Sequence, residues 1–303
     1  MSASGRAEIA RLPRPTDGEV RHSANTGGAD AQSRRQVRQS AYALCGKGMR
    51  LGYDGRDVVA DLDIEIPPGQ ITALVGANAC GKSTTLRALA RLLKPRDGVI
   101  TLDGRDIHTM RSKDLATKIG ILPQSPTAPE GITVADLVSR GRYPHQKWFR
   151  QWTNEDERVV AGALDATGTA DLADRPVDDL SGGQRQRVWI AMALAQETSV
   201  LMLDEPTTYL DVHHQVDVLD LVVELNREQQ VTIALVLHDL NLACRYAHHL
   251  IAMRSGEIVA QGAPDQIITE ELVEGVFGLK SKVIEDPVSH TPMVVPIGRH
   301  LRF

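Results

Sequence analysis

The most restrictive feature of this sequence is the octapeptide GANACGKS, residues 76–83. It follows the continuous apolar run ITALVG (71–76), which predicts a strand buried on both faces. It precedes TTLRALARLL (84–93), whose apolar spacing predicts a helix. The pattern G-x-x-x-x-G-K-[ST] in this context is typical of a phosphate-binding loop. Its glycines let backbone N–H groups turn toward an anion, and the helix adds its positive end.

The residue types of the loop predict how it would bind a nucleotide. Lys82 supplies a point charge for the outer phosphates, and the Ser83 hydroxyl is a candidate magnesium ligand. Ala79 stands where many such loops have Gly, which costs about 1 kcal/mol if the backbone needs a positive φ there. Cys80 is either a reactive thiol at a helix start or a small space-filler. The expected nucleotide-binding residues of the loop are Gly76, Ala77, Asn78, Ala79, Cys80, Gly81, Lys82, Ser83 and Thr84.

Two further apolar runs place the loop in a parallel sheet. SVLMLDEP (199–206) and VTIALVLHD (231–239) read as buried strands, and DVLDLVVELNRE (217–228) between them reads as a helix. Strand, helix, strand repeats with apolar strands predict a parallel sheet with crossover helices. VWIAMALAQ (188–196) predicts another helix that is buried on most of its surface. The fold class is therefore α/β.

The segments on either side of the loop follow other patterns. DLDIEIPPGQ alternates apolar and acidic residues before a turn, and VITLDGRDI (99–107) predicts a hairpin with Asp103-Gly104 at its turn. Residues 125–180 are polar-rich and read as helical. Residues 1–40 have no apolar periodicity, and we expect a disordered tail. That tail is either a dispensable extension or an arm that contacts lipid.

The second buried strand ends in two acids, Asp204 and Glu205. Ligands of open parallel sheets bind at the carboxyl edge of the strands, where these acids would lie. Asp204 can hold magnesium, usually through water, and Glu205 can align and deprotonate an attacking water. The chain is thus expected to hydrolyse a nucleoside triphosphate.

A third motif gives a family resemblance. LSGGQRQR (180–187), together with the phosphate loop and the acidic strand, resembles the signature of the ATP-binding cassette (ABC) ATPases. The resemblance implies a P-loop NTPase cassette with a mixed or parallel sheet core, an N-terminal antiparallel β subdomain and an inserted helical subdomain. It places the ABC ATPase domain at residues 41–303 and the helical subdomain at about 125–185. It also implies that two copies sandwich two ATP molecules head to tail, each signature facing the partner's nucleotide.

The resemblance assigns roles to individual positions. Tyr53 would stack on adenine; the alternative is that it only packs in its hairpin. Gln124 would touch magnesium and sense the γ-phosphate. Asp211 would signal across the dimer. His238 would contact the γ-phosphate and the attacking water. The implied cofactors are ATP and Mg²⁺. The expected catalytic residues are Lys82, Glu205 and His238, and the expected metal ligands are Ser83, Gln124 and Asp204. The signature residues expected to contact nucleotide are Ser181, Gly182, Gly183 and Gln184. We expect four other histidines to face solvent, namely His213, His214, His248 and His249.

The composition of the chain limits the kinds of molecule with which it is expected to associate. No apolar run reaches the roughly 18 residues of a membrane helix, so a transporter would need separate permease subunits. A net charge of −5 argues against nucleic acid, and three cysteines make no disulfide framework and fit a reducing cytoplasm. Four aromatic residues crowd YPHQKWFRQW (143–152) in a chain poor in them, either as local packing or as anchors for a membrane subunit. They are Tyr143, Trp148, Phe149 and Trp152.

A finer resemblance suggests the cargo. GRYPHQKWFRQW, TTYLDVHHQVDVLDLV and LHDLNLACRYAHHLIAMRSGEIVAQGAP are similar to importer ATPases for iron(III)-siderophores. That group overlaps the haem and cobalamin importers, which stay as alternatives. The expected protein is the ATPase at the cytoplasmic face of the membrane, with permease subunits and, indirectly, a substrate-binding protein as partners. Two other functional classes stay open, and the first is a soluble ABC ATPase that does not act in transport. The other class is a non-catalytic ATP-binding module, and the presence of Lys82, Glu205 and His238 argues against it.

Overall fold

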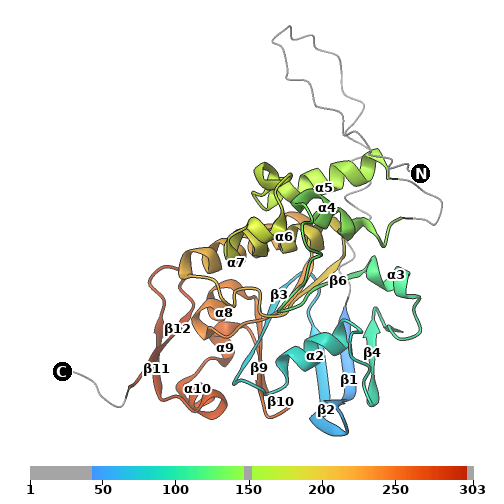
Figure 1. Ribbon diagram of the computed structural model, residues 1–303. Helices are drawn as coiled ribbons and strands as arrows, with labels where there is room; N and C mark the ends of the chain where they lie inside the picture. Colours follow the sequence, from blue (N-terminus) through green and yellow to red (C-terminus); the bar gives the residue numbers. More distant parts are fainter. Residues whose placement is uncertain (1–42, 147–151, 299–303) are drawn as a thin grey trace, which may run out of the picture. The chain divides into compact units, whose positions relative to one another are not determined.

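The computed structural model describes residues 43–146 and 152–298, drawn in colour in Figure 1. The predicted tail, residues 1–40, and the aromatic residues Trp148 and Phe149 lie outside the described residues. The strands are β1 Leu44–Tyr53, β2 Arg56–Ile66, β3 Ile71–Gly76, β4 Asp97–Leu102, β5 Arg105–Asp106, β6 Ile119–Leu122, β7 Val200–Leu203, β8 Thr232–Val236, β9 His249–Arg254, β10 Glu257–Gly262, β11 Ser281–Glu285 and β12 Pro292–Pro296.

The α-helices are α2 Lys82–Leu89, α3 Ser112–Ala116, α4 Val134–Ser139, α5 Asn154–Ala166, α6 Gly182–Ala195, α7 Val212–Gln229, α8 Leu240–Tyr246, α9 Pro264–Ile267 and α10 Glu270–Phe277. Short 3-10 helices are η1 Arg140–Arg142, η2 Ala170–Leu172 and η3 Val177–Asp179.

The central sheet has the strand order β10-β9-β3-β8-β7-β6 within the described residues. The five strands from β9 to β6 run parallel, and β10 pairs antiparallel with β9 at one edge. Every residue of β3, β7 and β8 is buried, which explains why these strands read as continuous apolar runs. The predicted mixed, mostly parallel sheet is confirmed.

The N-terminal sheet is antiparallel, with the order β2-β1-β4-β5. Leu62, Ile64 and Ile66 of β2 are buried while the acids between them are exposed, as the alternation predicted. The hairpin of β4 and β5 turns at Asp103 and Gly104, which both have positive φ (52° and 73°). Two positive φ values are what the favoured two-residue hairpin turn requires.

The two faces of the central sheet pack against different layers. On one face, Leu74 of β3 packs with Leu86 and Leu89 of α2, which fills the space between the two sheets (Figure 1). On the other face, Ile71 and Val75 pack with side chains of α6, α7 and the helices beyond them. Helix α2, which begins at the end of the phosphate loop, is therefore held between two sheets.

Helices α4, α5 and α6 lie between β6 and β7 in the sequence and lie together beyond the central sheet (Figure 1). This confirms the inserted helical segments, whereas the exact division of the chain into domains stays a prediction. The expectation of helix from residue 125 is wrong, because the first helix begins at Val134. Pro126 and Pro129 explain the delay, since proline disfavours helix at its own position and at the residue before it.

The C-terminal hairpin of β11 and β12 is fixed to α8. Asn241 exchanges two hydrogen bonds with the backbone of Val294, at 3.2 and 2.7 Å. Asp286 accepts from the backbone N–H of Val288 and lies 2.6 Å from Arg245. These contacts lower the pKa of Asp286 to about 2, first through the Val288 N–H and then through Arg245.

A buried arginine joins the inserted helices to each other. Arg142, at the end of η1, lies 2.9 Å from Asp156 of α5 and 2.9 Å from Glu197, and donates to the Ala195 carbonyl at the end of α6. Burial by itself raises the pKa of Asp156, but hydrogen bonds from Thr153 and Arg142 outweigh it and the pKa is lowered. Asp156 is therefore a charged partner for Arg142.

We predict that Arg142→Met lowers the free energy of unfolding by about 3–5 kcal/mol, because it leaves a buried carboxylate without its cation. Chemical denaturation with two optical probes measures the change. The matched control is Arg158→Met, whose ion pair with Glu155 (2.7 Å) is exposed and should contribute less than about 1 kcal/mol. Equal losses in both variants would contradict the role given to Arg142.

Candidate functional site

Three polar side chains follow three neighbouring strands at the same edge of the central sheet. Gln124, Glu205 and His238 each come two residues after the last residue of β6, β7 and β8. The phosphate loop follows β3, the next strand in the order β3-β8-β7-β6. Because these strands are parallel, their carboxyl ends share one edge, and the four features meet there.

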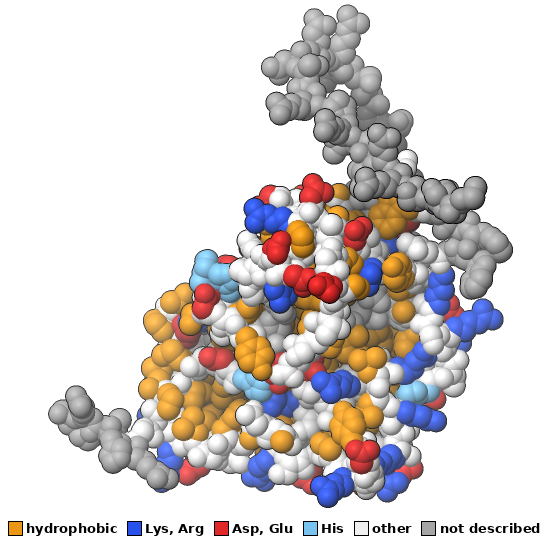
Figure 2. Space-filling view, viewed as in Figure 1, with side chains coloured by type: hydrophobic (Ala, Val, Ile, Leu, Met, Phe, Trp, Pro, Cys, Tyr) orange, Lys and Arg blue, Asp and Glu red, His pale blue; other side chains and the backbone are white. Residues whose placement is uncertain are grey.

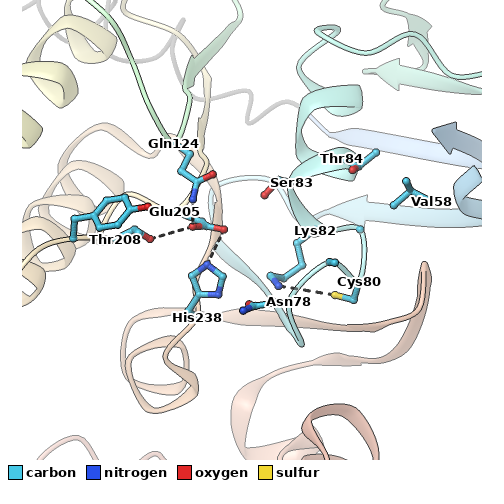
Figure 3. A pocket seen from close by; sticks show the side chains of 13 residues that line it. Val58, Asn78, Cys80, Lys82, Ser83, Thr84, Gln124, Glu205, Thr208 and His238 are labelled. Atoms are coloured by element: carbon cyan, nitrogen blue, oxygen red, sulfur yellow. Dashed lines mark hydrogen bonds and ion pairs between the residues drawn. The ribbon is translucent and has the colours of Figure 1, made fainter. Parts of the chain in front are cut away.

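These residues enclose one cavity of about 520 Å³ (Figure 3). The structure thus brings together most of the loop with Gln124, Glu205 and His238, as the sequence predicted. It adds three lining residues that sequence reasoning missed: Val58, Thr208 and Tyr209. The full lining is Val58, Asn78, Ala79, Cys80, Gly81, Lys82, Ser83, Thr84, Gln124, Glu205, Thr208, Tyr209 and His238.

The loop has the backbone that phosphate binding requires. Gly76 and Gly81 have φ values of 149° and 107°, and Ala79 has φ 60°, the positive value considered from the sequence. A Cβ at Gly76 would lie 2.2 Å from the Met253 carbonyl oxygen, so only glycine fits there. The Lys82 ammonium donates to the carbonyls of Gly76 and Ala77, both at 2.9 Å. Lys82 therefore crosses back over its own loop and holds it in shape.

The Glu205 carboxylate is oriented by three side chains from different segments (Figure 3). One oxygen lies 2.7 Å from His238 Nε2. The other accepts from Gln124 Nε2 at 2.5 Å and from Thr208 Oγ1 at 3.1 Å. Glu205 also has φ 55°, a left-handed conformation that a non-glycine residue adopts at a cost of order 1–3 kcal/mol. The fold thus fixes this carboxylate against the cavity at an energetic cost.

Asp204, one residue earlier, lies deeper. It is 1 % exposed, and neither carboxylate oxygen has a hydrogen-bond partner among the described residues. Arg87 Nη2 lies 3.4 Å from one oxygen. A buried carboxylate with open lone pairs is costly alone and suits a hard cation or its bound water. With the Ser83 hydroxyl and the Gln124 amide oxygen, Asp204 offers the oxygen donors that Mg²⁺ prefers.

The remaining predicted residues lie outside the described lining of the cavity. Ser181 caps α6, because its hydroxyl accepts from the Gln184 N–H and the Gln184 side chain accepts from the Ser181 N–H. Asp211 caps α7 by accepting from the His214 N–H at 3.0 Å, and its side chain is exposed. Tyr53 ends β1 and is 42 % exposed, so part of it remains accessible to a ligand. The roles assigned to Tyr53 and to the signature stay predictions.

The histidines that were expected to face solvent divide into two groups. His213 is exposed, as expected. The expectation is wrong for His214 and His249, which are half-buried. His249 begins β9, so strand pairing places it in the sheet, and burial lowers its pKa. The His214 ring lies against Gly183, where an added Cβ would come within 1.5 Å of His214 Cδ2. His248 is exposed, and its Nδ1 accepts from the Ile71 N–H at 3.0 Å.

Comparison with known proteins places this site in a family. Residues 59–208 match the family model described as ABC transporter. The chain is 56 % identical over 261 residues to the ferric enterobactin transport ATP-binding protein FepC of Escherichia coli (strain K12), a match that covers 86 % of this chain and 96 % of FepC. It is 54 % identical over 257 residues to the probable siderophore transport system ATP-binding protein YusV of Bacillus subtilis (strain 168), covering 85 % and 94 %.

Solved structures agree. A metal-chelate type ABC transporter in an inward-facing conformation matches with a TM-score of 0.73 and 30 % identity, over 86 % of this chain and 98 % of that one. The dimeric ATP-binding cassette MJ0796, bound to ADP and Pi after hydrolysis, matches with a TM-score of 0.64 and 26 % identity, over 73 % and 98 %. With the phosphate loop, the acidic strand end and the signature in place, the chain belongs to the ABC transporter family as one of its ATP-hydrolysing, ATP-binding proteins.

Proposed function

We propose that this protein is the ATPase of an importer for iron(III)-siderophore complexes. Two relatives at 56 % and 54 % identity are named for ferric enterobactin transport and for siderophore transport, and each aligns over more than nine-tenths of its length. A similar solved structure is a metal-chelate type transporter. The importers of haem and of cobalamin are the alternatives, because the cassette does not touch the cargo.

The observation that carries the catalytic part of the proposal is the triply held carboxylate of Glu205. His238, Gln124 and Thr208 fix both of its oxygens at the wall of the cavity that the phosphate loop also lines. In that position Glu205 can accept a proton from water as the water oxygen attacks the γ-phosphorus of ATP and the bond to the bridging oxygen breaks. His238 would orient the same water, and Lys82 would balance phosphate charge.

Ser83, Gln124 and Asp204 are the residues that would hold Mg²⁺, which offsets the negative charge of the phosphates when it is bound. Ser83 and Gln124 line the cavity, and Asp204, the residue before Glu205 of the lining, is buried with open lone pairs. Tyr53, exposed at the end of β1, would stack on the adenine ring.

The signature supports a dimeric working unit. Ser181 and Gly182 are exposed at the start of α6 and lie outside the described lining of the chain's own cavity. Tyr209 and Val212, on either side of Asp211, are 92 % and 76 % exposed, although both are apolar enough to favour burial. A second copy placed head to tail would cover them and bring each signature to the other copy's nucleotide. ATP would favour closure because the signature contacts phosphate only in the closed state.

A groove on the inserted helices is the proposed contact with the permease. It has a volume of about 370 Å³, and Tyr143 and Trp152 in its wall are 60 % and 44 % exposed. Exposed aromatic rings are efficient anchors at protein interfaces. The groove is lined by Ile132, Asp136, Ser139, Arg140, Tyr143, Gln146 and Trp152.

The proposed place in the cell follows from these partners. Across the described residues, no helix has the length and apolarity to cross a membrane. The protein would sit on the cytoplasmic face of the membrane, on permease subunits that receive the cargo from a substrate-binding protein. Lys and Arg side chains are interspersed with Asp and Glu on the face shown in Figure 2, which supports a protein partner over nucleic acid.

Uptake assays test the cargo. In cells that lack this protein but keep its permease, uptake of a radiolabelled iron(III)-siderophore should be lost and should return with the wild-type chain. Haem and cobalamin uptake should not change. Loss of haem or cobalamin uptake instead would replace the proposed cargo, and loss of none would exclude the importer.

We predict that Glu205→Gln binds ATP and forms the closed dimer but hydrolyses ATP at least about 100-fold more slowly, because the amide cannot accept the proton. Phosphate release measures turnover, and light scattering with ATP measures the dimer. Glu257→Gln, at an exposed position of β10, is the matched control and should leave both unchanged. Near-normal hydrolysis by Glu205→Gln would exclude Glu205 as the base.

For the groove, we predict that Tyr143→Ala with Trp152→Ala reduces co-purification with the permease at least about tenfold. The ATPase rate of the isolated chain should stay within about twofold, because neither residue lines the nucleotide cavity. Val288→Ser, which removes a still more exposed apolar side chain (76 %) from the C-terminal hairpin, is the control. Undiminished co-purification of the double variant would place the permease elsewhere.

A further inference from the structure

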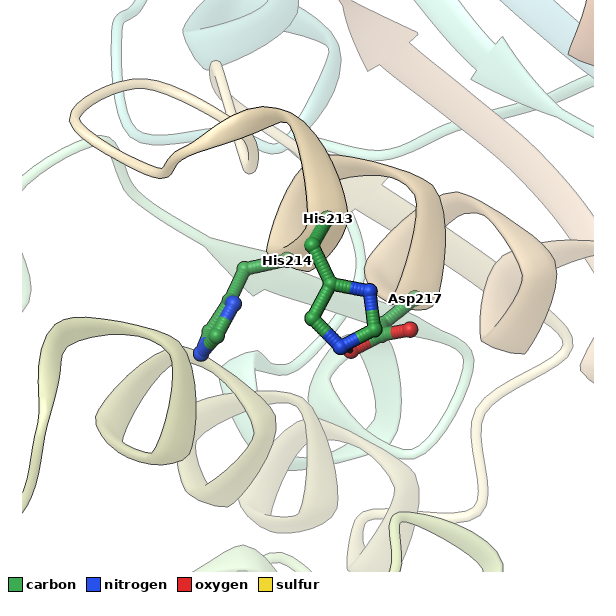
Figure 4. Close-up of side chains that lie close together, drawn as sticks. All are labelled: His213, His214 and Asp217. Atoms are coloured by element: carbon green, nitrogen blue, oxygen red, sulfur yellow. Dashed lines mark ion pairs between the residues drawn. The ribbon is translucent and has the colours of Figure 1, made fainter.

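The first two turns of α7 carry a cluster of potential metal ligands. His213, His214 and Asp217 each present a ligand atom there, and these atoms all lie within 4.8 Å of one another (Figure 4). His213 Nε2 is 3.7 Å from a carboxylate oxygen of Asp217. The two imidazole rings meet edge to face, with centroids 5.4 Å apart and planes at 83°.

The hydrogen bonding of the cluster is incomplete. The Nδ1 atom of His214 is buried and has no hydrogen-bond partner among the described residues. It lies 2.9 Å from a carboxylate oxygen of Asp211 in an ion-pair contact, and the same oxygen also accepts from the His214 backbone N–H. The 3.7 Å between His213 and Asp217 is too long for a hydrogen bond. A cation between His213 and Asp217 would replace this long contact with two ligand bonds, and the His214 imidazole is near enough to add a third.

The residue types select one class of cation. Two imidazoles with one carboxylate are a common set for Fe²⁺ and Zn²⁺, and the positions left open take water. Ligand atoms at about 2.0–2.2 Å from one ion lie about 3–4 Å from each other, so small side-chain rotations would close the cluster. Mg²⁺ prefers oxygen donors only, so the Mg²⁺ that accompanies ATP would not compete strongly.

The cluster adjoins two segments of the proposed dimer contact. The His214 ring lies against Gly183 of the signature, and the His214 backbone N–H is bound by Asp211. Neither His213 nor Asp217 belongs to the described lining of the nucleotide cavity. An ion held here would restrain His214 and, with it, the start of α6 and the turn that carries Asp211.

We propose that His213, His214 and Asp217 bind one divalent transition-metal ion of the Fe²⁺ or Zn²⁺ class, and that the bound ion slows ATP hydrolysis. Binding follows from the cluster alone. The effect on hydrolysis rests on the proposed function, because it requires that the signature and Asp211 act across a dimer.

Metal titration of the full chain without an affinity tag tests the binding. Zn²⁺ is titrated by calorimetry, Fe²⁺ likewise without oxygen, and Co²⁺ by its visible absorption, all with excess Mg²⁺ and no nucleotide. His213→Ala and Asp217→Asn should each weaken the affinity at least about tenfold. The control is His290→Ala, which removes an exposed histidine 2.6 Å from Glu285, and it should bind as the wild type does. Unchanged affinity in His213→Ala, or an equal loss in His290→Ala, would overturn the site.

The effect on hydrolysis has its own readout. With saturating Mg²⁺ and ATP, saturating Zn²⁺ or Fe²⁺ should slow the wild type about fivefold or more and leave His213→Ala unaffected. Without added metal the two should hydrolyse ATP equally fast. Equal inhibition of both would place the ion in the nucleotide cavity, and inhibition of neither would disprove the coupling. Glu205→Gln and the uptake assays do not involve this cluster, so its failure is distinguishable from failure of the proposed function.

Discussion

The register of four neighbouring parallel strands is the constraint on which the site depends. Leu122 pairs with Leu203, Leu203 with Leu235, and Leu74 with Val236, so the strand ends are nearly level. The residues that follow therefore project from one edge at similar heights. A slip of one residue would exchange the side chains of β7 and β8 between the two packed layers, and the misfit in both layers makes that slip very costly. Apolar packing thus sets the position of charged groups that could not hold that position themselves.

Several energetically unfavourable features lie at this same edge of the sheet, and the packing of the sheet offsets their free-energy cost. Glu205 and Ala79 have positive φ, and Asp204 is a buried carboxylate without a hydrogen bond among the described residues. Each would be unfavourable in an ordinary surface loop. Their grouping around one cavity indicates that the stable part of the fold maintains a site prepared for phosphate and for a cation. Arg87, on the helix between the two sheets, gives Asp204 its nearby positive charge. The packing of that helix therefore helps to offset the cost of burying the Asp204 carboxylate.

The sequence predicted features that depend on short stretches. The strand β3, the turn at Asp103 and Gly104, and the shared edge of Glu205 and His238 follow from local patterns. Features that depend on contacts between distant segments were missed. Val58 reaches the cavity because the antiparallel sheet packs across α2. No local sequence pattern in β2 predicts that Val58 lines the cavity. Thr208 could have been suspected, since it lies three residues after Glu205 in the turn that closes back on the carboxylate. The burial of His214 depends on Gly183 of another helix.

His214 and Gly183 also show how one chain can prepare a contact that it does not complete. A side chain at position 183 would collide with the His214 ring and not with the chain's own nucleotide, because the signature lies outside the described lining of the cavity. That packing holds the first turn of α6, where Ser181 and Gly182 are exposed and lie outside the described lining of the same chain's cavity. The turn at Asp211 is tied to it through the backbone of His214. In the proposed dimer, both segments would move as a unit, so a change at His214 would reach the partner's nucleotide without passing through the chain's own cavity.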